Sequence, residues 1–208
     1  GMGNGVQYDD SVFTAAIDTV NTLYLFGQSI ADLTGIEDFT ALTYLNCGYN
    51  NLTSLDVSGA TALAGFGCWS NQLTSLDVSG ATALTYLYCS YNQLTILDVS
   101  QNTALVALSC QNNQLTSLDV SQNIALVYLF CPYNQLTSLD LRNGNNTNIT
   151  YLDATNNPNL FCIDVDDATW SAANSTNIDA QHYFDNNCAG GYGCTDPIAC
   201  NYDASNIY

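Results

Sequence analysis

The stretch 42–62, with the sequence LTYLNCGYNNLTSLDVSGATA, is the template for most of this 208-residue chain. The same pattern begins again at Leu63, Leu84, Leu105 and Leu126, each time after 21 residues and with leucine at the same offsets. A fixed period of this length is typical of a repeat solenoid, in which no single unit buries its own apolar face and stacked turns form the core.

Each unit divides into two similar halves, LTYLNCGYNN and LTSLDVSGATA, and both have the form L-x-x-L-x-(Cys/Val). Alternating apolar residues in short runs indicate strands that bury one side. The sequence therefore predicts a mainly β solenoid with short capping helices, in which each turn contributes strands to two parallel β faces on opposite sides of a flattened tube.

The ends of the chain depart from the repeat. Val12, Phe13, Ala16 and Ile17 show i,i+4 spacing, which predicts a short helix that covers the first turn of the solenoid. The repeats themselves extend from an atypical unit near Leu23 to an imperfect one ending at Val165. The expected divisions are a helical cap at 1–19, the solenoid at 20–165, a C-terminal cap at 166–188 and a truncated cysteine-containing tail at 189–208.

The pattern L-x-x-L-x-C-x-x-N-x-L-T-x-L-D-V, over about residues 20–165, resembles the 21-residue leucine-rich repeats of secreted bacterial proteins. Segment 162–188 resembles the cap that follows such repeats, and 193–208 looks like the start of a small module found in exported bacterial proteins. The resemblance implies a secreted or cell-surface protein that binds a ligand and catalyses no reaction.

The nine cysteines fall into two groups. Five occupy an inward position where other units carry Leu25 or Ala154, and a free cysteine behaves at such a position as a small apolar residue. These five are Cys47, Cys68, Cys89, Cys110 and Cys131. A row of metal thiolates is the alternative, but zinc requires convergent rather than linear ligands. Cys162 and Cys188 bracket the cap, so a disulfide between them is expected, and Cys194 and Cys200 are candidates for a local pair.

A regular row of asparagines accompanies these cysteines, one in each unit. Asparagine at a repeated bend satisfies backbone groups with its side chain, so a structural role is expected. The row comprises Asn50, Asn71, Asn92, Asn113, Asn134 and Asn157.

The net charge of −18, with Arg142 as the only base, argues against nucleic acid as a partner, because phosphate binding requires clustered Lys and Arg. No apolar run approaches the length of a membrane span. The repeated acids are weak calcium candidates, but one flat face rarely supplies six to eight oxygen ligands. A solvated row that accepts hydrogen bonds from serine, threonine and amides is preferred, with no cofactor expected. These acids are Asp56, Asp77, Asp98, Asp119 and Asp140.

Nothing in the sequence predicts an enzyme. The only imidazole, His182, lies in the cap segment and is expected to be a solvated residue there. Neither a nucleophile elbow, a phosphate-binding loop nor a zinc-protease motif is present. Two carboxylates would suffice for a glycosidase, but nothing distinguishes two of the repeated aspartates from the others.

The two outward faces differ in composition. The L-T-x-L-D-V half repeats Ser and Asp, whereas the other half varies and is rich in aromatic residues, which are typical of recognition surfaces. Stacked tyrosines that merely shield the sheet are the alternative. The predicted ligand-binding residues are Tyr44, Trp69, Tyr86, Tyr88, Tyr91, Tyr128, Phe130, Tyr133 and Tyr151.

The expected function is therefore recognition or adhesion outside the cell, with a protein or a glycan as ligand. A structural spacer without a specific ligand is a second interpretation, and binding to an ice or mineral surface is a third. The pattern does not indicate an oligomeric state.

Overall fold

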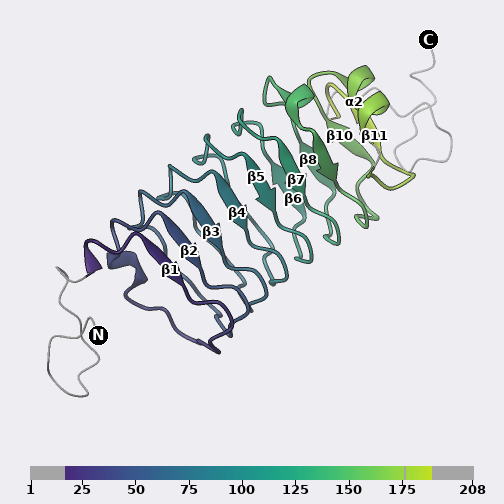
Figure 1. Ribbon diagram of the computed structural model, residues 1–208. Coiled ribbons are helices and arrows are strands. Elements are labelled where there is room, and N and C mark those ends of the chain that lie inside the picture. The colour runs from purple at the N-terminus through teal and green to yellow at the C-terminus, as the bar shows by residue number, and fades with distance from the viewer. Residues whose placement is uncertain (1–16, 176, 189–208) are drawn as a thin grey trace, which may run out of the picture.

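The computed structural model describes residues 17–175 and 177–188, which form an elongated solenoid of parallel strands (Figure 1). Strands that stack in the order β1-β2-β3-β4-β5-β7-β9 make one side. Leu45, Phe66, Leu87 and Leu108 occupy equivalent positions in successive strands, so the 21-residue period is the register of the sheet. The strands are β1 (Thr22–Tyr24), β2 (Tyr44–Asn46), β3 (Gly65–Gly67), β4 (Tyr86–Tyr88), β5 (Ala107–Ser109), β7 (Tyr128–Phe130) and β9 (Tyr151–Asp153).

The opposite side is less regular than the repeat predicts. Its four-stranded sheet has the order β11-β10-β8-β6, built from β6 (Ser117–Asp119), β8 (Ser138–Asp140), β10 (Cys162–Asp164) and β11 (Tyr183–Asp185). In the earlier turns this side forms a single isolated bridge, between Asp56 and Asp77. Within the paired strands, Arg142 contacts Asp140 of β8 and Asp164 of β10.

Short helices complete the described chain. Two are 3-10 helices, η1 (Ile36–Asp38) and η2 (Asn146–Asn148), and one is the α-helix α2 (Ala168–Asn174). Asp167 caps α2 by accepting a hydrogen bond from the Trp170 amide. Over the residues that the structure describes, no helix is long and apolar enough to cross a membrane.

The interior consists of leucine ladders and the cysteine ladder. All five ladder cysteines are free and buried, as predicted. Burial raises the pKa of the Cys47 and Cys89 thiols to about 12, so they stay protonated at neutral pH. The sulfur atoms of Cys47, Cys89 and Cys131 lie 3.5, 3.6 and 3.4 Å from carbonyl oxygens of the next turn.

The asparagine row joins neighbouring turns, which confirms its predicted structural role. The Asn71 Nδ2 group donates to the carbonyls of Cys68 in its own turn, at 3.0 Å, and of Cys47 in the preceding turn, at 3.1 Å. Its Oδ1 atom accepts from the Leu52 amide at 3.0 Å. Asn92 makes the equivalent bonds one turn further on. Each of these bends is therefore satisfied by an asparagine side chain.

The C-terminal cap is joined to the last repeat by the expected disulfide between Cys162 and Cys188, whose Cα atoms are 5.8 Å apart. Strand β11 pairs with β10 and extends the second sheet. Cys194 and Cys200 lie outside the described residues, as do the tail at 189–208 and most of the predicted N-terminal helical cap. At the other end, Ile17 is buried.

The prediction that His182 is a solvated residue is wrong. Its side chain is buried, with Nδ1 accepting from the Asp179 amide at 3.2 Å and Nε2 lying 3.3 Å from the Asn157 carbonyl. These contacts fit a neutral ring that carries its proton on Nε2 and donates it to the repeat. The Asp179 carboxylate lies 3.4 Å from Nε2 as well, and no repeated residue pattern marks these partners in the sequence.

We expect protonation of His182 to destabilise the protein. Burial lowers its pKa below the model-peptide value of 6.5, so the unfolded chain binds this proton more readily than the folded chain. Stability should therefore fall as the pH decreases through about 6.5. Urea unfolding midpoints between about pH 7.5 and 5 would measure this loss, and His182→Gln should remove most of it. If the unfolding midpoint of the variant depends on pH as steeply as that of the parent, His182 is not the source of the stability loss.

Candidate interaction surface

The outward side of the seven-stranded sheet, with the bend that follows each strand, is called here the tyrosine face. Because side chains alternate across a strand, burial of Leu87 turns its neighbours Tyr86 and Tyr88 outward. Seven of the nine predicted binding residues are exposed, and Trp69 and Phe130 are half-buried. Phe130 is stacked on Tyr151, with ring centroids 6.1 Å apart.

The aromatic residues on this face alternate with small ones from turn to turn. In strand register, Tyr44 is followed by Gly65, then by Tyr86, Ala107 and Tyr128. Tyrosines in this row therefore recur on every second turn from β2 to β7. The alternation ends at β9, where Tyr151 pairs directly with Tyr128.

A second aromatic row with the same two-turn spacing lies in the bends. Tyr49, Tyr91 and Tyr133 have φ values of 60°, 54° and 55°, in the left-handed region that a non-glycine residue rarely occupies. Hydrogen bonds between turns hold them there, for example from the Tyr49 amide to the Trp69 carbonyl at 2.9 Å. A position that is strained for any side chain except glycine thus carries an exposed tyrosine in alternate turns.

Trp69 has a structural role in addition to its place on this face. A Cβ atom added at Gly67 would lie 2.2 Å from Trp69 Cζ3, and one at Gly48 would lie 2.7 Å from Cε2. The indole ring therefore covers the backbone of two neighbouring turns, where only glycine leaves room. Trp69 therefore fits the alternative interpretation, in which an aromatic side chain shields the sheet. This contact with the sheet explains why Trp69 is only half-exposed.

The sequence interpretation missed two aromatic residues at the N-terminal end of the face. Tyr24 and Phe26 are exposed, and their rings lie 5.2 Å from Tyr44 and 6.0 Å from Trp69, respectively. A signal was present, because aligning Leu23 with Leu45 places both residues at outward positions. The departure of this first unit from the repeat concealed it.

Two shallow hollows lie on the tyrosine face and share Tyr88 as a wall. One, of about 500 Å³, is lined by residues including Gly65, Tyr44 and Tyr86, and the Tyr44 ring lies over Gly65, where an added Cβ would be 2.7 Å from Tyr44 Cδ2. The other, of about 570 Å³, lies on the bend side and is lined by residues including Trp69 and Tyr91. Partial burial, with Tyr86 and Tyr44 nearby, raises the pKa of Tyr88, so its hydroxyl stays protonated and can donate a hydrogen bond.

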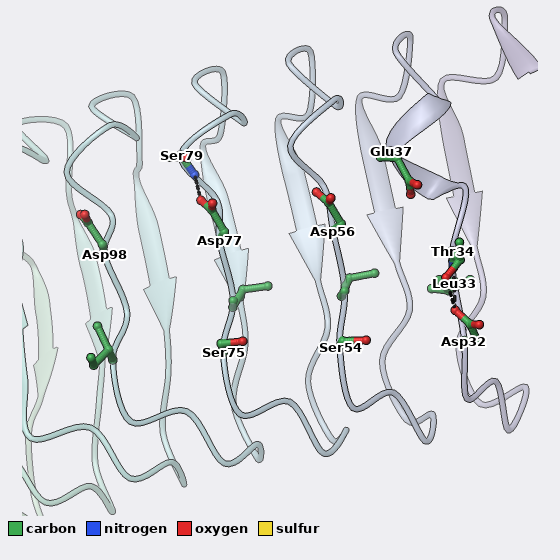
Figure 2. A pocket seen from close by; sticks show the side chains of 13 residues that line it. Asp32, Leu33, Thr34, Glu37, Ser54, Asp56, Ser75, Asp77, Ser79 and Asp98 are labelled. Atoms are coloured by element: carbon green, nitrogen blue, oxygen red, sulfur yellow. Dashed lines mark hydrogen bonds between the residues drawn. The ribbon is translucent and has the colours of Figure 1, made fainter.

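The opposite side, called here the aspartate face, carries an open hollow of about 720 Å³. Figure 2 shows Asp56, Asp77 and Asp98 aligned along it in successive turns. The Asp77 carboxylate accepts from the Ser79 amide at 2.9 Å, and the side-chain and backbone hydrogen bonds of Ser79 lower its pKa. Equivalent amide bonds reach Asp56 and Asp98 from two residues further along the chain. The predicted hydrogen-bonded acidic row is therefore confirmed.

The aspartates remain the weak calcium candidates that the sequence predicts. Among residues 17–175 and 177–188, no group of three or more His, Cys, Asp or Glu side chains is arranged to hold a metal ion. At the end of the row, the Arg142 guanidinium contacts Asp140 at 2.5 Å and Asp164 at 3.3 Å, and donates to the Asn186 carbonyl at 3.4 Å. The only base thus links the row to the C-terminal cap.

Comparison with known proteins places this architecture among bacterial leucine-rich-repeat proteins. No protein-family model matches the chain. Over 53 residues it is 45% identical to internalin J of Listeria monocytogenes, a match that covers 26% of this chain and 6% of internalin J. The solved functional domain of InlJ, which includes a cysteine ladder, is 32% identical over 74% of this chain and 46% of that domain, with a TM-score of 0.47.

Two further solved structures share the fold. An internalin, InlF of Listeria monocytogenes, is 24% identical with a TM-score of 0.58. The match covers 83% of this chain and 49% of the InlF chain. A leucine-rich-repeat protein of Leptospira interrogans is 20% identical with a TM-score of 0.58. The match covers 82% of this chain and 50% of the Leptospira chain. This chain thus spans about half the length of these structures. Its fold is therefore that of a leucine-rich-repeat solenoid, and it is homologous to internalin J over the 53 matched residues.

Proposed function

We propose that this chain is a non-catalytic recognition module that binds a protein ligand through the tyrosine face, with a glycan as the alternative ligand. The exposed aromatic side chains that recur along one side of the seven-stranded sheet carry this proposal. Binding energy concentrates in a few tyrosine and tryptophan side chains at interfaces, and flat rings with phenolic hydroxyls combine apolar contact with hydrogen bonding.

The site of action in this proposal is the cell exterior. The Cys162–Cys188 disulfide is of a kind that persists in oxidising compartments, and the sequence match to internalin J favours adhesion or protein interaction as the role. The inward ladders are required by packing, and the aspartate face repeats the same chemistry at each turn. Only the tyrosine face varies enough along the solenoid to select a partner.

We expect the double substitution Tyr86→Ala with Tyr88→Ala to weaken ligand binding at least tenfold, or by about 1.4 kcal/mol. Candidate ligands would come from screening the chain against arrays of surface proteins and of glycans, and titration calorimetry would measure each affinity. The thermal unfolding midpoint should change little, because both side chains are exposed.

The matched control is Asp77→Asn with Asp98→Asn on the aspartate face, which should leave the affinity nearly unchanged. Loss of binding in this control, with retention in the tyrosine pair, would assign recognition to the acidic side instead. A chain that binds no protein or glycan but inhibits ice recrystallisation would support the surface-binding alternative, and one that does neither would support a spacer.

A further inference from the structure

We propose that an ordered water molecule binds inside the solenoid, between the side-chain amides of Asn102 and Asn123. Both residues are fully buried. Within the part of the chain that the structure describes, the Oδ1 atoms of Asn102, Asn123 and Asn146 are the buried side-chain atoms that have no hydrogen-bond partner in the protein. A buried acceptor without a donor costs free energy, so these oxygens require a ligand that donates hydrogen bonds.

Asn102 and Asn123 occupy the same place in consecutive turns. Each lies three residues before the first leucine of the next unit, and the amide of that leucine donates to the asparagine carbonyl at 3.0 Å in both turns. Ala60 and Ala81 take this place in two earlier turns, with the same backbone bond at 3.0 and 3.1 Å. The pair of acceptors is therefore built into two particular turns and is not required by the repeat.

The amide nitrogens fix the direction of both oxygens. The Asn102 Nδ2 group donates to the carbonyls of Val78 at 3.0 Å and of Ala81 at 2.9 Å. The Asn123 Nδ2 group donates in the same way to the carbonyls of Val99 and Asn102, both at 2.9 Å. Exchange of the amide oxygen and nitrogen would bring Oδ1 against two carbonyl oxygens, so it cannot satisfy the acceptor. Because the bonds are equivalent, the two Oδ1 atoms point the same way, one turn apart.

The distance between the turns suits a single water molecule. Equivalent atoms in neighbouring strands lie about 4.8 Å apart. Two hydrogen bonds of about 2.8 Å span that distance when they meet at about 120° at the shared oxygen, which is close to the angle between the two O–H bonds of water. One water can therefore donate to both Oδ1 atoms, as buried waters commonly do between unsatisfied polar groups. Calcium would need about six to eight oxygen ligands, and the nearby carbonyls already accept from Nδ2.

Asn146 has a different setting, so the proposed site is confined to the pair. Its Nδ2 group donates to Ser171 Oγ in α2 at 2.9 Å rather than to the preceding turn. The Asn123 carbonyl instead accepts from Asn143 Nδ2 at 3.0 Å.

The test is a crystal structure of the 208-residue chain at a resolution that defines ordered water. We expect one peak of density within about 2.5–3.0 Å of both Oδ1 atoms. In solution, nuclear Overhauser contacts between water and the side-chain amide hydrogens of Asn102 and Asn123 should report a water that stays bound.

Asn123→Ala is the matched variant, because alanine stands at the equivalent place in two earlier turns. It should remove the density peak and the water contact of Asn102. Asn102→Ala should remove the same peak and replaces the first variant if that one does not fold. Two buried Oδ1 atoms with no density between them, or amides that have turned to protein donors, would overturn the inference. A peak that persists unchanged in either variant, or one with calcium-like distances of about 2.3–2.6 Å, would overturn it as well.

Discussion

Leu87→Ala should lower the free energy of unfolding by about 2–5 kcal/mol, the cost of truncating a buried leucine. Leu87 is fully buried in β4, between its register partners Phe66 in β3 and Leu108 in β5. The neighbouring turns cannot close the cavity without breaking the backbone register that their hydrogen bonds fix. Urea unfolding monitored by circular dichroism would measure the loss.

Tyr88→Ala is the matched control for Leu87→Ala, because the two residues are adjacent in the same strand and face opposite ways. The Tyr88 side chain is exposed, so its truncation should cost far less than that of Leu87. Equal shifts of the two unfolding midpoints would contradict the inward and outward assignment of this strand, and with it the location of the tyrosine face.

Replacing both Cys162 and Cys188 by serine should destabilise the chain by roughly 3.5 kcal/mol in the chain-entropy model for a loop of 26 residues. The bridge ties the chain that follows β11 to β10 in the last repeat, so we expect the C-terminal turns to open first. Hydrogen exchange of β10 and β11, together with the unfolding midpoint, would report both effects.

Reduction of the parent protein is the control for this double variant. A reductant should lower the midpoint of the parent by a similar amount and leave the double variant unchanged. The ladder thiols should not contribute to this effect of the reductant, because they form no disulfide and burial keeps them protonated at every position from Cys47 to Cys131. Peptide mapping that detects a Cys47–Cys68 disulfide in the native protein would contradict this assignment.

The repeat determines what could be predicted about the fold. Its period yields the register of the first sheet, the inward leucines and cysteines and the asparagine bonds at each bend, because all of these recur at fixed offsets. The unequal second sheet could not be predicted, because its half-units have nearly the same sequence in every turn. His182 was misread because its partners, the Asn157 carbonyl and the amide and carboxylate of Asp179, follow no repeated pattern in the sequence.

The sequence predicts which residues of the candidate site point outward, but not how their side chains and bends are arranged. Alternation along each strand identifies Tyr44, Tyr86 and Tyr128 as outward residues. The position of Trp69 across Gly48 and Gly67 depends on contacts between turns, which one repeat considered alone does not show. The left-handed backbone at Tyr49 and its equivalents was hidden as well, because tyrosine is not a residue expected there.

The two-turn alternation also constrains how such a chain can change length during evolution. Recombination between repeated stretches of a gene adds or removes whole units, and the leucine ladders would accept one unit of 21 residues as readily as two. Loss of a single unit between Tyr44 and Tyr128 would bring two tyrosine-bearing or two small-residue turns together, whereas gain or loss of a 42-residue pair would preserve the alternation. Selection for the surface, rather than for the core, would then favour inheritance of the coding repeats in pairs.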